Sequence, residues 1–392
     1  MKILTFLDYY LPGFRAGGPV RTVSSMVSLL SGRFDFLIVT LDRDFGDHEA
    51  YPSARPNEWV QVGLGKVLYI PKRDLGIATL VRIVRSTKPD ILYANSFFSR
   101  TTIRLLVARR FGWLGSIPMV LAPRGEFSSG ALKLRRGRKQ TFIALGSRLG
   151  LFRNLLWQAS TEFERHDILQ VFGGHQEDTV PRSIGIAPDL FEPHDHRQDR
   201  SNAPKTRGRA RFVFLSRISP KKNLRTAIEL IGLLSGDVSL DIYGGIDDQR
   251  YWQECQAAIS RAGPGIRITW HGCLEPNRVI DVFAGFDFFV FPTLGENFGH
   301  VVLESLRAGC PVVLSDTTPW ERIEADGAGW VLPLAQRDRW REVLRGCVDM
   351  DEESHAAMRE SARCAAHRCN DQDSALVQNV TLFEAALGMR SV

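Results

Sequence analysis

The stretch Phe291-Pro-Thr-Leu-Gly-Glu-Asn-Phe-Gly-His-Val-Val-Leu-Glu304 decides how this chain is interpreted. It continues the run Phe286-Asp-Phe-Phe-Val-Phe291, which is apolar on both faces, as a buried parallel strand is. Pro292 ends that strand, and Asn297 can cap a helix that runs to about Ala308. The pattern therefore predicts a buried strand, a tight loop and a helix in succession.

Two carboxylates frame this predicted loop. Glu296 is expected in the loop at the carboxyl end of the strand, and Glu304 one or two turns into the helix. Between them, the amides of Phe298, Gly299 and His300 are expected at a helix N-terminus, which favours an anion. The His300 side chain either orients a sugar hydroxyl or a phosphate, or serves packing. Carboxylates that accept hydroxyl groups beside an anion site suit a nucleotide-sugar.

The overall composition is that of a globular protein. The chain has 392 residues, of which 44% are hydrophobic and 24% charged, so two domains of ordinary size are expected. Fifty Lys and Arg residues stand against 44 Asp and Glu residues, which gives a pI of about 9.1. This modest basic excess fits an anionic ligand or an anionic membrane surface, and is too weak to indicate nucleic acid.

The sequence also carries signals about its compartment. It has no apolar run of the length of a membrane-spanning helix. The apolar run Met1–Leu7 breaks at Asp8, so we expect a first buried strand there and not a signal peptide. The six cysteines form no CxxC pair, and we expect a reducing compartment, the cytoplasm.

Apolar runs typical of strands alternate with helical patterns along the chain. Such alternation predicts an α/β fold in which helices cover both faces of a parallel sheet. The first set of predicted strands comprises Lys2–Leu7, Phe36–Leu41, Val67–Ile70, Ile91–Ala94, Met119–Ala122 and Ile168–Phe172. The second set comprises Phe212–Ser216, Ser239–Tyr243, Ile266–Trp270, Phe286–Phe291, Val312–Ser315 and Trp330–Leu332.

A polar segment separates the two sets of strands. We expect an N-terminal Rossmann-like domain over residues 1–195, a linker over 196–210 and a C-terminal Rossmann-like domain over 211–373. A C-terminal helix at about 374–392 is expected to pack back on the first domain. Two facing doubly wound domains bind ligands in a cleft between their strand carboxyl ends.

Two further loops are predicted to contact a phosphate. Gly17 and Gly18 follow the first predicted strand and let the backbone approach a ligand closely, although a plain strand-to-helix turn is equally consistent with them. Arg217 and Lys222 follow the first strand of the second domain. Two cations at the end of a strand can clamp a diphosphate and neutralise charge on a leaving group, whereas the alternative is a solvated basic turn.

Three residues are candidates for the acceptor side of a cleft. Asn95 follows the predicted strand Ile91–Ala94, and Arg124 and Glu126 follow the predicted strand Met119–Ala122. All three are expected at strand carboxyl ends, where they can touch donor or acceptor. A structural ion pair is an equally good interpretation of Arg124 and Glu126.

Two other stretches have candidate roles. Residues 131–157 mix Lys and Arg with large apolar residues and contain no Asp or Glu, so they can lie on anionic lipid or form a solvated helix face. Asp42-Arg-Asp44 has the DxD spacing of some metal-dependent sugar transferases. Motifs this short recur by chance, and we expect no metal site.

Taken together, these residues resemble the family 4 glycosyltransferases, which are retaining enzymes with two facing Rossmann-like domains, the GT-B fold. The resemblance covers nearly the whole chain and is strongest over 211–335. It is carried by features already described and by one further segment: the E-x7-E pair Glu296/Glu304, the cations Arg217 and Lys222, Gly17-Gly18, and Arg-Ala-Gly-Cys-Pro-Val-Val313. The segments Pro123-Arg-Gly125 and Thr318-Pro-Trp320 are similar to a branch associated with surface polysaccharide assembly.

The resemblance implies roles for individual residues. Glu304 resembles the glutamate that binds the ribose, and Glu296 the one that faces the transferred sugar. The amides of Phe298 and Gly299 would hold sugar and phosphate. Arg217 and Lys222 would stabilise the departing diphosphate, so no metal and no other cofactor is expected.

We therefore predict a retaining glycosyltransferase that uses a nucleotide-diphosphate sugar. Its acceptor would be a lipid-linked or growing surface glycan at the inner face of the cytoplasmic membrane. Two alternatives stay open: a nucleotide-sugar epimerase or phosphorylase on the same fold, and a non-catalytic nucleotide-sugar-binding subunit.

Overall fold

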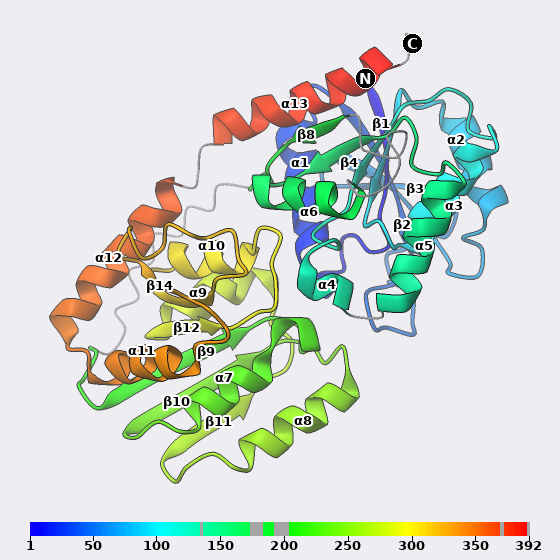
Figure 1. The fold of residues 1–392 in the computed structure, drawn as a ribbon. Helices are drawn as coiled ribbons and strands as arrows, with labels where there is room; N and C mark the ends of the chain where they lie inside the picture. The colour runs from blue at the N-terminus through cyan, green and yellow to red at the C-terminus, as the bar shows by residue number, and fades with distance from the viewer. Residues whose placement is uncertain (134–135, 173–182, 192–203, 369–371, 390–392) are drawn as a thin grey trace. The chain divides into compact units, whose positions relative to one another are not determined.

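The computed structural model describes residues 1–133, 136–172, 183–191, 204–368 and 372–389 (Figure 1). They belong to two compact units. Unit 1 comprises Met1–Pro193 and Gln372–Val392, and unit 2 comprises His194–Asp371. The chain thus leaves unit 1, builds unit 2 and returns to unit 1.

Unit 1 contains an eight-stranded sheet in the order β3-β4-β2-β1-β5-β6-β7-β8, parallel except for the β3–β4 pair. The strands are β1 Lys2–Phe6, β2 Asp35–Leu41, β3 Trp59–Val62, β4 Gly65–Ile70, β5 Ile91–Asn95, β6 Met119–Ala122, β7 Leu156–Ala159 and β8 Ile184–Ile186. The helices are α1 Gly18–Leu30, α2 Ile77–Thr87, α3 Arg100–Arg110, α4 Ser129–Lys133, α5 Arg136–Arg148, α6 Glu162–Phe172 and α13 Gln372–Gly388.

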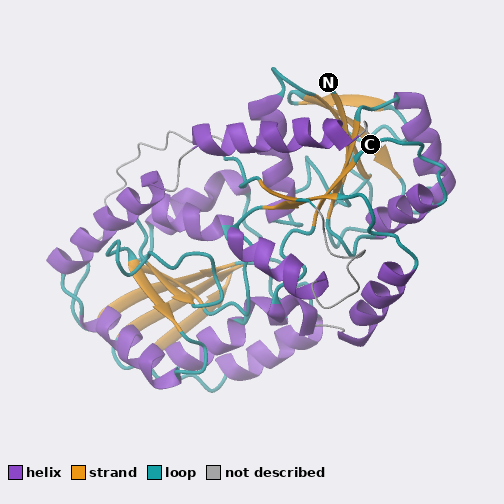
Figure 2. Cartoon of the chain, turned by 45° about the horizontal axis from the view of Figure 1, so that its top comes forward, coloured by secondary structure: helices purple, strands orange, loops and turns teal. Residues whose placement is uncertain are grey.

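Successive residues of the central strands enter two different cores, because side chains alternate between the faces of a sheet. Leu4 and Phe6 of β1 belong to the core formed with α2, α3, α5 and α6. Ile3, the residue before Leu4, belongs to the core formed with α1 and α13. Helices therefore cover both faces of the sheet (Figure 2), which explains why its strands are near-continuous apolar runs.

Helix α13 completes the second of these cores. The Phe383 side chain is fully buried, and its ring lies 5.5 Å from that of Phe34 and 5.3 Å from that of Tyr93, centroid to centroid. The Asn379 amide donates a 2.8 Å hydrogen bond to the Pro188 carbonyl. The C-terminal helix is thus an integral part of unit 1.

Unit 2 contains a fully parallel six-stranded sheet in the order β11-β10-β9-β12-β13-β14. The strands are β9 Arg209–Leu215, β10 Asp237–Tyr243, β11 Ile266–Trp270, β12 Phe288–Phe291, β13 Val312–Ser315 and β14 Gly329–Leu332. The helices are η2 Pro220–Lys222, α7 Leu224–Ile231, α8 Gln249–Ile259, η3 Pro276–Arg278, α9 Val279–Ala284, α10 His300–Arg307, α11 Arg337–Asp349 and α12 Glu352–Arg368. The predicted fold class of two parallel-sheet α/β domains is confirmed.

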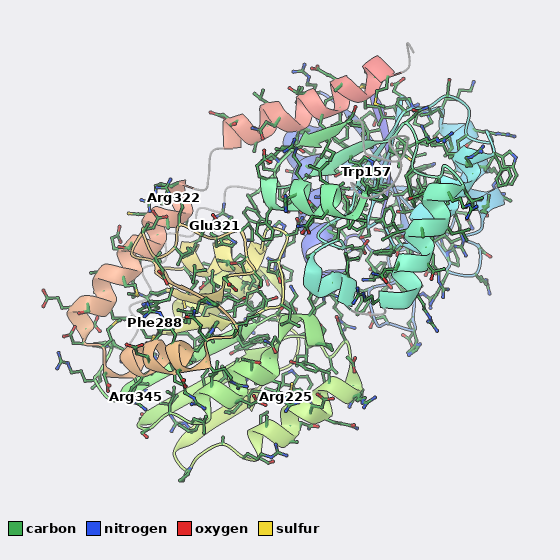
Figure 3. All side chains as sticks on the ribbon, viewed as in Figure 1. Trp157, Arg225, Phe288, Glu321, Arg322 and Arg345 are labelled. Atoms are coloured by element: carbon green, nitrogen blue, oxygen red, sulfur yellow. The ribbon has the colours of Figure 1, made fainter. Side chains whose placement is uncertain are left out.

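Several predicted elements were wrong. Ile168–Phe172, predicted as a strand, is the last part of helix α6. Leu156 and Trp157, placed in the basic stretch, belong to the buried strand β7, and Trp157 is 1% exposed inside unit 1 (Figure 3). Strands β3 and β8 were not predicted. Most of the predicted linker, 196–203, lies outside the described residues, and β9 begins at Arg209.

Within the described residues, no helix is long and apolar enough to cross a membrane.

Candidate functional site

The loop between β12 and α10 is fixed by hydrogen bonds on several sides. The Thr293 side chain is fully buried, and its hydroxyl donates to the Lys221 carbonyl at 3.2 Å. The hydroxyls of Ser315 and Thr317 both donate to the Thr293 carbonyl, at 2.7 and 2.8 Å. The Glu296 amide in turn donates to the Thr317 carbonyl at 3.2 Å. The Glu296 backbone is thereby held between two neighbouring strand ends.

The same loop is joined to the turn that follows β9. The Leu294 amide donates to the Lys221 carbonyl at 2.8 Å, and the Asn223 side-chain amide donates to the Pro292 carbonyl at 2.8 Å. Across this junction the Lys222 ammonium forms an ion pair with Glu296 Oε1. The two side chains are only 15% and 11% exposed. The structure thus brings together two predicted site residues that lie 74 positions apart.

The ion pair sets the charge state of Glu296. Burial is the largest single influence and acts to raise the pKa of this carboxyl group, but the Lys222 ammonium, the Lys221 ammonium and the Thr293 hydroxyl together outweigh it. The pKa of Glu296 is therefore lowered below the ordinary value of a glutamate. The carboxylate is ionised at neutral pH and can accept hydrogen bonds.

This lowered pKa predicts a pH dependence of stability. Because the folded-state pKa is below the unfolded one, the contribution of Glu296 is complete above the ordinary glutamate pKa and is lost as the pH falls through the lowered value. Wild type should therefore lose more unfolding free energy than Glu296→Gln as the pH falls from about 5 to about 3, across and below the ordinary glutamate pKa of about 4.3. Urea unfolding over a pH series measures the difference. The exposed Glu321→Gln is the control, and parallel curves for wild type and Glu296→Gln would contradict the prediction.

The second predicted cation has its own carboxylate partner. Arg217, just after β9, donates from Nη1 to Asp247 Oδ2 at 2.8 Å. Asp247 follows β10, and its amide donates to the Ile218 carbonyl at 3.1 Å. Burial raises the pKa of Asp247, although the positive charges of Arg217 and Lys222 oppose this. Arg217, Lys222, Glu296 and Asp247 thus gather at the carboxyl ends of β9, β10 and β12.

Helix α10 begins later than the sequence indicated. Its first residue is His300, and it is preceded by Gly299 in the left-handed region, with φ 83°. A side chain is strained at that φ, so glycine makes the turn, and the predicted cap at Asn297 was wrong. The first-turn amides of an eight-residue helix point out of its N-terminus, beside Phe298 and Gly299. Glu304 is the fifth residue of this helix and is half-buried.

Trp320 supports the turn before α10. Its indole N–H donates a 2.6 Å hydrogen bond to the Phe298 carbonyl, and the Trp320 and Phe298 rings are 5.4 Å apart. The centroids of the His300 and Phe298 rings are 5.5 Å apart, and the two rings form a T-shaped pair. Sequence reasoning did not assign Trp320 or Asp247 a role in the site, because each reaches it from another strand end.

In unit 1, the predicted glycine loop is anchored by one of the two DxD aspartates. Gly17 has φ 78°, and Gly18 is the first residue of α1. The nearly buried Asp44 carboxylate accepts the amides of Phe14 at 2.8 Å and Arg15 at 3.1 Å. Asp44 is thus an anchor of the loop. Among the described residues, no group of three or more His, Cys, Asp or Glu side chains could hold a metal ion.

Two of the predicted acceptor-side residues, Arg124 and Asn95, belong to a buried network. Arg124 is 4% exposed and donates to Asp189 Oδ1 at 2.9 Å and to Asn95 Oδ1 at 3.0 Å. It also bonds the Tyr93 hydroxyl. Glu126 accepts the Phe98 amide at 2.8 Å. These contacts favour the structural interpretation of Arg124, in which it is part of an internal ion pair.

The basic stretch 131–157 is not one continuous amphipathic surface. Leu134 and Arg135 lie outside the described residues. Ile143, Phe152 and Leu155 are buried in the core of unit 1. Most of the apolar residues that suggested a lipid-facing surface are therefore internal, so the segment as a whole does not form such a surface, although Leu145 and Leu149 at the end of α5 are exposed.

Unit 2 matches a known protein family. Residues 195–364 match the family model described as glycosyl transferases group 1. This segment is a group 1 glycosyltransferase domain. It contains Arg217, Lys222, Asp247, Glu296 and Glu304, that is, the whole site in unit 2.

Relatives of the group 1 domain are distant. D-inositol 3-phosphate glycosyltransferase of Nocardia farcinica is 25% identical over 218 residues, which are 53% of this chain and 48% of that protein. Alpha-monoglucosyldiacylglycerol synthase of Streptococcus pneumoniae is 22% identical over 90% of this chain and 80% of that protein. The chain spans about half the length of the first curated relatives it matches.

The fold extends beyond the group 1 domain. The crystal structure of Anabaena Alr3699/HepE in complex with UDP-glucose has a TM-score of 0.67 and 18% identity, and the match covers 98% of this chain and 99% of that one. At this identity the match establishes the fold. The whole chain, with the group 1 domain as its second unit, has a fold of the GT-B type.

Proposed function

We propose that this protein is a glycosyltransferase that moves a sugar from a nucleotide-diphosphate donor to a hydroxyl acceptor. The observation that carries the proposal is the Lys222–Glu296 ion pair beside the start of α10, with Arg217 at the neighbouring strand end. Such a donor contains a diphosphate, a sugar and a ribose. The site offers matching groups in one place: two oriented cations, an ionised carboxylate and a helix N-terminus.

The proposed roles follow from this geometry. Glu304 accepts the ribose hydroxyls, Glu296 faces the sugar, and the amides of Phe298 and Gly299 bind sugar and phosphate. Arg217 and Lys222 neutralise the diphosphate as it leaves, so that no metal or other cofactor is needed. Asp247 keeps the Arg217 guanidinium oriented before the donor arrives.

In the proposed retaining reaction, the bond between the anomeric carbon and the diphosphate oxygen breaks. The acceptor oxygen bonds to the same carbon from the same side, and its proton passes to the departing diphosphate. Negative charge on that diphosphate grows along this path, so the two cations stabilise the transition state more than the bound donor. Their loss should therefore lower turnover more than donor affinity.

The proposed acceptor is a lipid-linked or growing surface glycan, with the protein at the inner face of the cytoplasmic membrane. The segments Pro123-Arg-Gly125 and Thr318-Pro-Trp320 support this acceptor class by their similarity to the polysaccharide-assembly branch. A relative named as a synthase of an alpha-monoglucosyldiacylglycerol is consistent with it.

A thermal-shift screen tests the donor. Wild type is heated with UDP, GDP, ADP and CMP and with their common sugar conjugates, with and without Mg²⁺. A rise with one diphosphate that needs no metal is the expected result, because ligand binding to the folded state raises the melting temperature. Release of that diphosphate on adding acceptor then separates a transferase from an epimerase or a non-catalytic binder. No rise with any nucleotide would overturn the proposal.

The same screen tests Glu304. Replacement by alanine should weaken binding of the selected diphosphate about 10–100-fold, because a hydrogen bond to a charged acceptor contributes roughly 1.5–3 kcal/mol. Isothermal titration of wild type and Glu304→Ala gives the two dissociation constants. Glu353→Ala on α12, an exposed carboxylate, is the matched control. Equal affinities in wild type and Glu304→Ala would remove this residue from the ribose site.

A further inference from the structure

Four large apolar side chains are exposed around the ends of α3 and α5 in unit 1. Phe111 and Trp113 follow α3 and are 65% and 44% exposed, and Leu145 and Leu149 at the end of α5 are 55% and 52% exposed. We call these four residues the apolar patch. Single exposed apolar residues are ordinary, but a gathering of large ones on one surface marks a binding site.

Ring stacking and hydrogen bonds order the apolar patch. The Phe111 and Trp113 rings are stacked, with centroids 5.2 Å apart and planes 20° from parallel. Between the helices, Arg110 Nε donates to the Leu149 carbonyl at 2.8 Å. The Leu149 amide donates to the Leu145 carbonyl at 2.9 Å, so these two leucines lie one turn apart on the same helical face. The two halves of the patch are therefore linked through Arg110, the neighbour of Phe111 in the sequence.

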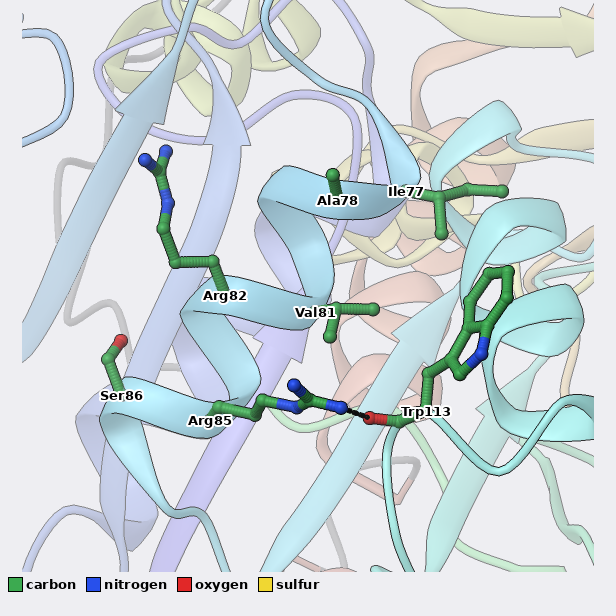
Figure 4. A pocket seen from close by; sticks show the side chains of 7 residues that line it. All are labelled: Ile77, Ala78, Val81, Arg82, Arg85, Ser86 and Trp113. Carbon is green, nitrogen blue, oxygen red and sulfur yellow. Dashed lines mark hydrogen bonds between the residues drawn. The ribbon is translucent and has the colours of Figure 1, made fainter.

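A groove continues the patch toward α2. It has a volume of about 890 Å³ and lies between Trp113 and the Ile77, Ala78 and Val81 side chains of α2 (Figure 4). Arg85 on the same helix donates from Nη2 to the Trp113 carbonyl at 3.3 Å, which ties the turn to α2. The groove is thus apolar inside, with guanidinium groups on its helix.

The segment of sequence that carries the patch is basic. From Leu75 to Trp157 the sequence has 15 Lys and Arg residues and two acidic residues, Asp90 and Glu126. Asp90 accepts the Lys2 amide and Glu126 the Phe98 amide. The exposed arginines beside the patch are Arg82, Arg85, Arg110, Arg148 and Arg153. A protein partner that buried this surface would have to supply many carboxylates, whereas an anionic bilayer offers phosphate groups everywhere.

We propose that the apolar patch docks unit 1 on an anionic lipid bilayer. The Trp113 ring lies at the level of the headgroups, where amphipathic aromatic rings are favoured, and the Phe111 ring stacked on it is buried at the boundary with the acyl chains. The flanking arginines contact lipid phosphates, and the groove along α2 receives the upper part of an acyl chain. This surface replaces the predicted one at 131–157, from which it retains Leu145, Arg148, Leu149 and Arg153. The inference depends on unit 1 alone, and it stands or falls separately from the proposed transfer reaction.

Flotation with vesicles tests the proposal on the full-length chain. Vesicles of phosphatidylcholine alone are compared with vesicles containing one third phosphatidylglycerol. Wild type should float with the anionic vesicles and be released by high salt, because salt screens the arginine–phosphate attraction. Phe111→Ser/Trp113→Ser should reduce the bound fraction about tenfold or more, since it removes two large apolar anchors. Arg82→Gln/Arg148→Gln should reduce binding to anionic vesicles roughly fivefold or more.

Matched controls distinguish an effect of the apolar patch from the effect of removing any exposed apolar side chain. Leu233→Ser and Val377→Ser change apolar residues that are 63% and 65% exposed elsewhere on the molecule, and they should float as wild type does. If the double variant unfolds, the single variant Phe111→Ser is tested in its place. Wild type that floats with neither vesicle, or a patch variant that floats unchanged, overturns the proposal. A wild-type dimer that the patch variant converts to monomer, without lipid binding, would assign the surface to a second copy and also overturn it.

Discussion

Lys222→Ala is expected to lower turnover about 10²–10³-fold, because removal of one preoriented group that stabilises developing charge has an effect of this size. The Lys222 ammonium is held by Glu296 and lies 5.4 Å from the centroid of the Phe291 ring, in a site that is largely shielded from solvent. Release of nucleotide diphosphate, with the donor chosen by thermal shift, measures turnover. Donor affinity should change much less, since the charge is greatest in the transition state.

The same substitution also leaves Glu296 as an unpaired, largely buried carboxylate. Breaking a buried pair on one side destabilises a protein by about 3–5 kcal/mol, whereas removing both partners has a much smaller effect. Lys222→Ala/Glu296→Ala should therefore regain most of the unfolding free energy without regaining turnover. Lys221→Ala removes the same charge from the same turn without breaking the pair, and should have a far smaller effect. Recovery of turnover in the double variant would mean that Lys222 acts only through stability.

Arg124→Ala is expected to lower the free energy of unfolding by about 3–5 kcal/mol, because it strands the Asp189 carboxylate, which is 4% exposed. The same change removes the donors to Asn95 and to the Tyr93 hydroxyl. Urea unfolding measures the loss. Arg82→Ala on the exposed face of α2 is the control, and it should stay within about 0.5 kcal/mol of wild type.

This experiment separates the two interpretations of Arg124. A structural residue lowers stability, while the rate per folded molecule below the unfolding transition stays near that of wild type. A residue that touches the acceptor gives the reverse: nearly unchanged stability and a strongly reduced rate. The second result would contradict the contacts described above and would restore the acceptor-side assignment.

The elements that sequence patterns predicted correctly are those with an unambiguous period. Strand β12 is fully apolar and ends at Phe291, directly before Pro292, and the turn before α10 contains glycine, so the loop and the helix were predictable within three residues. Ile168–Phe172 was wrongly predicted as a strand because isoleucine, valine and phenylalanine favour strands. A stronger signal preceded it: Thr161 Oγ1 accepts the Glu164 amide at 3.1 Å, as in a capping box, which starts a helix.

The pairs that build the site were beyond local sequence reasoning. Lys222 and Glu296 were both predicted to be functional, but their ion pair depends on β9 and β12 being neighbours in the sheet. Asp247 reaches Arg217 because β10 lies on the other side of β9. Strand order is a property of the whole sheet, and the spacing of residues along the chain does not encode it directly. Trp320 was overlooked for the same reason.

The return of α13 to unit 1 has a consequence for biosynthesis. Phe383 fills the space beside Phe34, Phe36 and Tyr93, but about 190 residues separate it from Pro193, where the first segment of this unit ends. A ribosome that adds about 5–20 residues per second needs roughly 10–40 s for that interval. Until then the nascent N-terminal unit presents an unfilled apolar face. Chaperones that bind such faces would therefore meet this chain before its first domain is complete.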